Sequence, residues 1–311
     1  MTHLAVWTFG NDSAFPIQIN TDTKGDPVAD PIFLRAFRAI PSNFVSHCTG
    51  VIVRLRMWSP IQRILNKWFV GLFGIDMGEA ELDLASYLSI EEVFTRKLRS
   101  GARPVQGDLC SPADGKLVIA GDCAGGTAVQ AKGINYSVQE LISGENLALV
   151  SPGQKFSRYF TVYLAPHNYH RVHAPLDAKI SFISHIPGKL WPVNERFVNV
   201  VPQLFVANER MVFGLEPRRG GKAWIVMVGA FNVGRMTAVA WPNFATNDGR
   251  RQTRVGQTSV FPQVDVALGE ELGTFMLGST VIVLMDEDCA AAFGNTPILF
   301  PKTVRMGEKL I

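Results

Sequence analysis

The chain has 311 residues, which is enough for one large domain or two smaller ones with an extensive core. Hydrophobic residues make up 47% of it and the formal net charge is only +3, so we expect no nucleic-acid partner. The four cysteines are scattered without C-x-x-C spacing, which argues against a zinc ribbon or a disulfide framework and favours a reducing compartment.

Residues 1–30 are polar and rich in Asp, Thr and Gly, and we interpret them as a poorly ordered extension. The first residues carry no basic segment, so a secretory signal is not expected. No uncharged apolar run reaches about 18 residues, so we expect no membrane-spanning helix.

Residues 31–100 have the pattern of amphipathic helices. Ser59 followed by Pro60 predicts a helix start, with Ser59 as the N-cap. Ser89 and Glu92 form a capping box that predicts another helix. Phe44, Val51, Leu55 and Trp58 suggest an earlier, less regular helix, and a clear apolar face follows Pro60 at Ile61, Ile64, Leu65, Trp68, Phe69, Leu72 and Phe73.

Two interpretations of these helices remain open. Most amphipathic helices pack their apolar face on the protein's own core. Residues 31–75, however, hold six basic and no acidic residues together with Trp and Phe, a composition typical of helices on an anionic membrane surface. We therefore regard 31–100 as a helical membrane-association region, in which one helix can face the core and another the lipid.

The pattern changes to β-strands at about residue 101. Short apolar runs alternate with Gly, Pro and Asn turns, which predicts a largely antiparallel, barrel-like β domain over 101–311. The whole chain is thus expected to be α+β, with N-terminal helices on this catalytic domain. The expected strands contain the runs 117–120, 160–164, 180–183, 224–228, 236–241 and 281–285.

Ser279 follows Gly278 immediately before a β-branched apolar run. Glycine tolerates the backbone distortion needed for a neighbouring hydroxyl to attack its carbonyl. Attack by the Ser279 hydroxyl would convert the peptide bond to an ester, and elimination followed by hydrolysis would leave a pyruvoyl group. The ordinary alternative is a turn glycine that leads into a buried strand.

Asp114 and a histidine cluster are the other candidates for chemistry. Asp114 precedes Gly115, a pair that usually marks a turn, although its carboxylate could also orient a histidine. His167, His170 and His173 recur at every third position, but no Cys, Asp or Glu lies within the cluster, so we expect no metal. Acid–base work suits these imidazoles better, because histidine titrates near neutral pH.

Short motifs in order along the chain resemble the phosphatidylserine decarboxylase family, prokaryotic type. The most specific are Tyr169-His170-Arg171-Val172-His173 and Leu277-Gly278-Ser279-Thr280. The others are Ile75-Asp76-Met77, Phe94-Thr95-Arg96, Arg103-Pro104, Pro112-Ala113-Asp114-Gly115, Gln130-Ala131-Lys132-Gly133, Asn135-Tyr136-Ser137, Val193-Asn194, Asn208-Glu209-Arg210 and Val228-Gly229-Ala230.

This resemblance implies self-cleavage between Gly278 and Ser279, with Asp114 orienting His173 and His173 deprotonating Ser279. The pyruvoyl group made from Ser279 would then form a Schiff base with phosphatidylserine, and loss of CO2 would give phosphatidylethanolamine. His170 is the candidate for acid–base work at the substrate carbon. Two positions depart from the family, with Asn168 in place of the usual Asp and Phe231 where Thr is common.

The resemblance also implies that both cleaved chains stay associated, that the processed pair forms a homodimer, and that it binds the cytoplasmic side of the cell membrane peripherally. Two other functions remain open: a membrane-binding scaffold that never matures, and a pyruvoyl decarboxylase for a soluble amino acid. The basic amphipathic helices favour a lipid substrate over the latter, and the set of Asp114, His173 and Ser279 favours processing over the former.

Overall fold

The computed structural model describes residues 42–131, 134–231, 235–247, 256–276, 279–294 and 296–311. The expected 1–30 extension and Gly278 therefore lie outside the described residues. In the part of the chain that is described, no helix combines the length and apolar character needed to cross a membrane.

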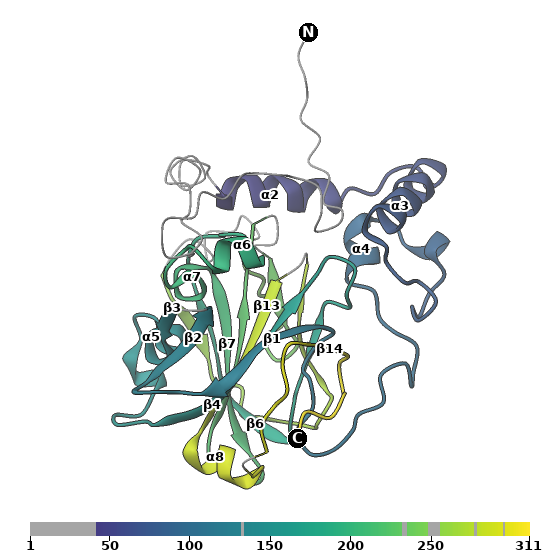
Figure 1. Cartoon of the computed structure of the whole chain (residues 1–311). Coiled ribbons are helices and arrows are strands. Elements are labelled where there is room, and N and C mark those ends of the chain that lie inside the picture. Colours follow the sequence, from purple (N-terminus) through teal and green to yellow (C-terminus); the bar gives the residue numbers. More distant parts are fainter. Residues whose placement is uncertain (1–41, 132–133, 232–234, 248–255, 277–278, 295) are drawn as a thin grey trace, which may run out of the picture.

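Helices lead into the β domain at its N-terminal side. In Figure 1, α2 lies across one end of the β domain, and α3 and α4 lie beside it. Ser89 caps α4 as predicted, because its Oγ accepts a hydrogen bond from the Glu92 N–H. Ser59 was wrongly predicted as an N-cap: it is already the first residue of α3, and Trp58 takes the cap position. The bounds are α2 Ser42–Val53, α3 Ser59–Phe73, η1 Leu84–Ser86 and α4 Ile90–Phe94.

Helix α3 turns part of its apolar face away from the protein. Gln62 and Asn66 are 3% and 0% exposed, whereas Ile64 and Trp68 are 69% and 57% exposed. The buried amides are satisfied, since Gln62 donates to Asn66 and Asn66 donates to the Tyr87 carbonyl. The expected division into an apolar and a polar face is therefore present in the sequence, but the buried side of α3 includes polar residues.

Within the described residues, a nine-stranded antiparallel sheet forms the centre of the β domain, and β13 lies in its interior between β8 and β4. Five of the six predicted apolar runs lie within its strands, and the sixth begins in β9 of a smaller sheet. The order is β10 (Thr258–Val260), β6 (Ala178–Ile186), β7 (Arg210–Pro217), β8 (Ala223–Val228), β13 (Ser279–Asp286), β4 (Phe156–Leu164), β1 (Gly115–Asp122) and β14 (Lys302–Val304), with β11 (Val264–Val266) also paired to β6.

The expectation of a barrel-like domain needs correction. Among the described strands, β10 and β11 at one end of the large sheet do not pair with β14 at the other, so the sheet is open. The fold is α+β with mostly antiparallel sheets, and smaller elements surround the large sheet. These smaller elements are β5 (Arg171–His173), β12 (Glu271–Phe275) and β9 (Met236–Ala238) in one sheet, β2 (Thr127–Ala131) and β3 (Ile134–Ser137) in another, and the short helices α5 (Val138–Ser143), η2 (Leu147–Leu149), α6 (Glu195–Val198), α7 (Leu204–Ala207) and α8 (Glu287–Ala292).

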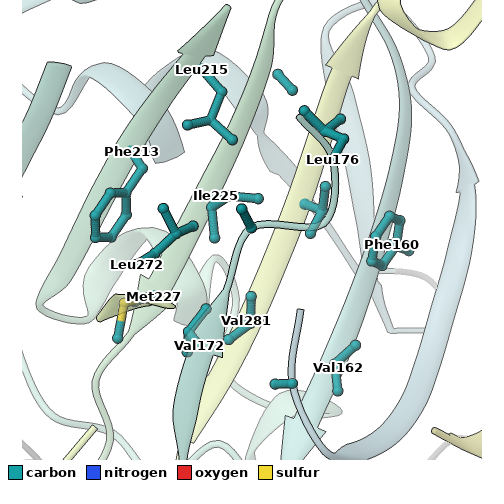
Figure 2. Close-up of a cluster of buried hydrophobic side chains, with 14 of the residues drawn as sticks. Phe160, Val162, Val172, Leu176, Phe213, Leu215, Ile225, Met227, Leu272 and Val281 are labelled. Atoms are coloured by element: carbon teal, nitrogen blue, oxygen red, sulfur yellow. The ribbon is translucent and has the colours of Figure 1, made fainter. Parts of the chain in front are cut away.

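Strand β13 is buried on both faces, which explains its continuous apolar sequence. Val281 and Val283 belong to the core between the large sheet and the β5–β12–β9 sheet, while Ile282 and Leu284 belong to the core on the opposite face. In Figure 2, Val172 and Leu272 of the small sheet lie in the same apolar cluster as Val281. Because side chains alternate along a strand, β13 connects both cores.

Candidate active site

Ser279 is the first residue of β13 and lies opposite Leu164 of β4. Its side chain is buried, and its Oγ has no hydrogen-bond partner among the described residues. Because α8 directly follows β13, the start of β13 lies at the end of the sheet away from α8, the end across which α2 lies (Figure 1). A buried hydroxyl without a partner is costly, so a free nucleophile at this position calls for an explanation.

His173 is held at both ring nitrogens. Nδ1 lies 2.8 Å from the Gly269 carbonyl oxygen, so it must carry the proton and donate it. Nε2 then accepts a hydrogen bond from the Tyr169 hydroxyl at 3.0 Å. Burial lowers the pKa of His173, which leaves a neutral imidazole with its basic lone pair at Nε2.

Gly269 is required at this position by its backbone. Its φ of +81° is in the left-handed region, and an added Cβ would lie 2.4 Å from Cγ2 of Val105. The glycine thus allows the chain to present its carbonyl to His173 while it packs against Val105.

His170 has the same tautomer but a free base nitrogen. Nδ1 donates to the Asn168 carbonyl at 2.9 Å, and Nε2 has no partner among the described residues. The ring packs 3.9 Å from the Phe94 ring, centroid to centroid, and burial lowers the pKa of His170 to about 3. The Phe275 N–H donates to the His170 carbonyl. Phe275 precedes Ser279 by four residues, so their Cα atoms are at most about 15 Å apart. His170 therefore lies in the same region as Ser279.

Asp114 binds an arginine and not, in this structure, a histidine. Arg103 donates to both carboxylate oxygens, through Nε to Oδ1 at 2.9 Å and Nη2 to Oδ2 at 2.6 Å, and the Met306 N–H also donates to Oδ1. Gly115 allows β1 to approach β4 closely here, since a Cβ would lie 2.3 Å from the Tyr163 carbonyl oxygen. The bonds that orient His173 come from Gly269 and Tyr169 instead.

Two histidines of the cluster each use one ring nitrogen on the backbone. His170 and His173 each use Nδ1 on a backbone carbonyl, and no group of three or more His, Cys, Asp or Glu side chains within the described residues is placed to hold an ion. Of the two imidazoles, that of His170 has a ring nitrogen without a partner among the described residues, whereas both ring nitrogens of His173 are hydrogen-bonded.

A model of the family described as phosphatidylserine decarboxylase matches residues 90–311, which include every residue of this site. The chain belongs to the phosphatidylserine decarboxylase family. It is 39% identical over 287 residues to a phosphatidylserine decarboxylase proenzyme of Anaeromyxobacter sp. (strain K), covering 90% of this chain and 98% of the relative. Proenzymes of the same name from Myxococcus xanthus and Ectopseudomonas mendocina are each 36% identical, covering 83% and 90% of this chain and 90% and 97% of the relatives.

Sequence reasoning about this decarboxylase family member missed two contacts. Arg103 and Tyr169 stand in recognised motifs, but no spacing rule shows that they bind Asp114 and His173. The departure from the family at Asn168 has a local role: its side-chain oxygen accepts the Ala165 N–H at 2.8 Å, and its carbonyl accepts from His170. An aspartate there would add a negative charge that favours protonated His170, whereas asparagine adds none.

Proposed function

We propose that this chain is a phosphatidylserine decarboxylase proenzyme that cleaves itself between Gly278 and Ser279 and then converts phosphatidylserine to phosphatidylethanolamine and CO2. The observation that carries the proposal is the buried Oγ of Ser279 at the start of β13, which has no hydrogen-bond partner among the described residues. A desolvated hydroxyl without such a partner can attack without first breaking a hydrogen bond.

The proposed cleavage begins with attack of the Ser279 oxygen on the Gly278 carbonyl carbon. The hydroxyl proton passes to a base, the peptide C–N bond breaks, and the nitrogen of residue 279 takes up a proton. Loss of the Cα proton of residue 279 then breaks the Cβ–O bond and releases Gly278 as a new carboxylate terminus. Hydrolysis of the remaining dehydroalanine releases ammonia and leaves a pyruvoyl group at residue 279.

His173 is the proposed base, since it is neutral and its lone pair is at Nε2. That nitrogen accepts from Tyr169 in the uncleaved chain, so it must exchange this bond for one to Ser279, or receive the proton through the Tyr169 hydroxyl. Burial lowers the pKa of His173, while the bond to Gly269, the charge of Glu271 and, least, the charge of Asp114 favour its protonated form. Both ring nitrogens of His173 are already bonded, so a direct bond from His173 to Asp114 requires His173 to give up its contact with Gly269 or Tyr169.

The position of β13 supports the proposal that both chains stay together after cleavage. The small chain, 279–311, would contribute β13 to the interior of the sheet and β14 to its edge beside β1. All eight residues of β13 are buried, and it pairs along its length with β4 and β8. Assembly of two processed pairs into a homodimer remains a prediction.

The pyruvoyl group supplies a carbonyl that takes up the substrate amine and accepts the electron pair released with CO2. The free amine is needed for this, and phosphatidylserine carries an ammonium near neutral pH. That ammonium loses its proton to water before the amine reacts. His170, whose Nε2 has no partner among the described residues, is the proposed group that delivers a proton to the carbon from which CO2 has left. A positioned acid–base group of this kind contributes about 10²- to 10⁴-fold.

The purified protein should release CO2 from phosphatidylserine and form phosphatidylethanolamine in equal amount. Borohydride, which reduces the carbonyl, should abolish this activity, and intact-mass analysis should show fragments 1–278 and 279–311. Turnover of free serine with no turnover of the lipid would indicate a soluble amino-acid decarboxylase. An uncleaved protein that only binds lipid would indicate a scaffold.

We also propose that residues 31–100 attach the enzyme peripherally to an anionic membrane, on its cytoplasmic side. The support is the outward apolar face of α3, with Ile61, Ile64 and Trp68 exposed beside Arg63 and Lys67. Each cation near an anionic surface contributes on the order of 1 kcal/mol. The active-site end of β13 lies at the same end of the sheet as α2 (Figure 1).

Replacing Ile64 and Trp68 together by glutamine should weaken binding to phosphatidylglycerol vesicles roughly 10- to 100-fold, because two apolar side chains no longer leave water. Vesicle flotation at low and high salt measures it, and salt should weaken wild-type binding by screening over about 10 Å at 0.1 M. Leu299→Gln is the control, since Leu299 is also exposed but lies outside α2 and α3. Salt-insensitive binding, or equal loss in the control, would contradict the assignment.

A further inference from the structure

Arg96 is a buried cation that has no carboxylate partner among the described residues. It is 4% exposed, and the one hydrogen bond found there for its side chain runs from Nη2 to the His167 carbonyl at 3.3 Å. Its Nε and Nη1 find no acceptor among the described residues. A guanidinium stays charged in a protein, so these two buried donors lack the anion that such a group normally has.

Neighbouring arginines do have such partners. Arg103 binds Asp114 and Glu79, and Arg171 binds Glu271. Tyr87, Asp114 and Asp76 act on Arg96 through their charge, but none of them is hydrogen-bonded to its guanidinium among the described residues. The Nε and Nη1 donors of Arg96 are therefore open to an acceptor that this part of the chain does not supply.

Arg96 lies beside the catalytic candidate His170. Phe94 packs against the His170 ring, the Thr95 carbonyl accepts two hydrogen bonds from Arg171, and Arg96 itself bonds to His167. The 94–96 segment thus runs along 167–171, and the charge of Arg96 is one cause of the lowered pKa of His170, after burial. Arg96, with two donors that lack an acceptor among the described residues, and the neutral base His170 therefore lie within electrostatic range of each other.

We propose that Arg96 binds the phosphodiester of the substrate headgroup through Nε and Nη1, an inference that rests on the proposed decarboxylase function. The substrate offers two anionic oxygen groups, the phosphodiester and the carboxylate. An arginine on the departing carboxylate would stabilise the ground state more than the transition state, in which that charge moves into the carbonyl adduct, and would slow the reaction. The phosphodiester keeps its charge throughout, so binding it positions the substrate without this penalty.

The test compares processed Arg96→Gln with wild type, using phosphatidylserine as substrate and glycerophosphoethanolamine and ethanolamine as inhibitors. We expect KM for phosphatidylserine to rise about 10- to 100-fold with a smaller change in kcat, as for loss of charged hydrogen bonds. The inhibition constant of glycerophosphoethanolamine should rise by a similar factor, while that of ethanolamine, which lacks phosphate, should not change. Arg96→Lys should recover part of the loss.

Arg218→Gln is the matched control, because it removes the same charge from an exposed arginine outside residues 31–100 and should leave all constants unchanged. Self-cleavage involves no headgroup, so Arg96→Gln should still be cut, and that cleavage reports correct folding. If Arg96→Gln fails to fold, the same constants are read from Arg96→Lys. If Arg96→Gln raises KM for phosphatidylserine but leaves the inhibition constant of glycerophosphoethanolamine unchanged, Arg96 binds the carboxylate and the proposal is wrong. The proposal is also wrong if Arg96→Gln changes none of these constants. An inactive wild type would refute the proposed function instead.

Discussion

Ser279→Ala is expected to remain a single chain of 34.2 kDa without decarboxylase activity. The substitution removes the only atom that can attack the Gly278 carbonyl in the proposed reaction, and with it the precursor of the pyruvoyl group. Because Oγ makes no hydrogen bond among the described residues, the variant should fold, with thermal stability equal to or slightly above that of uncleaved wild type. Intact mass, CO2 release and a melting curve measure the three outcomes.

Thr280 provides a close control for this result. It is the next residue of β13, equally buried, and its Oγ1 also lacks a partner among the described residues. Thr280→Val keeps the shape and removes the hydroxyl, and we expect it to be cleaved like wild type. If Ser279→Ala is still cleaved, or if Thr280→Val is the variant that stays uncleaved, Ser279 is not the nucleophile.

The two histidines should separate cleavage from decarboxylation. His173→Asn is expected to stay uncleaved, whereas His170→Asn should be cleaved and lose about 10²- to 10⁴-fold in phosphatidylethanolamine formation. Asparagine can keep the donor that each Nδ1 provides to a backbone carbonyl, so the change removes chiefly the base at Nε2. A gel for cleavage beside measured CO2 release gives both readings.

Alanine at the same positions completes the comparison. His173→Ala should also stay uncleaved but melt earlier than the asparagine variant, since the Gly269 carbonyl and the Tyr169 hydroxyl lose a buried partner. Normal turnover by cleaved His170→Asn would show that His170 is not the acid–base group of decarboxylation. Efficient cleavage of both His173 variants would show that His173 is not the base for cleavage.

Much of the fold was predictable because strands with two buried faces have an unmistakable sequence. The run from Val281 to Met285 predicted β13, and the alternation of its side chains between two cores explains why every position is apolar. The barrel-like closure was wrong, because apolar runs locate strands but carry no information on whether β10 and β14 meet.

The candidate site was predictable as a set of residues but not as a set of contacts. The motifs named Asp114, His170, His173 and Ser279, yet pairing across the sequence decides what each one binds. Arg103 competes for the Asp114 carboxylate. Helix α3 shows the same limit, because its periodicity located a face, while the amide pair of Gln62 and Asn66 decided which side is buried.

The interior place of β13 makes folding depend on the order of events. Before cleavage, β13 is tethered to the rest of the chain, and its insertion between β8 and β4 is an intramolecular step. After cleavage, the same insertion requires two separate molecules to meet, and the larger one would present two open strand edges that invite aggregation. The cleaved protein therefore stays folded because it unfolds slowly, since it cannot readily refold once its two chains have separated. Correct folding has to be completed in the proenzyme, before cleavage.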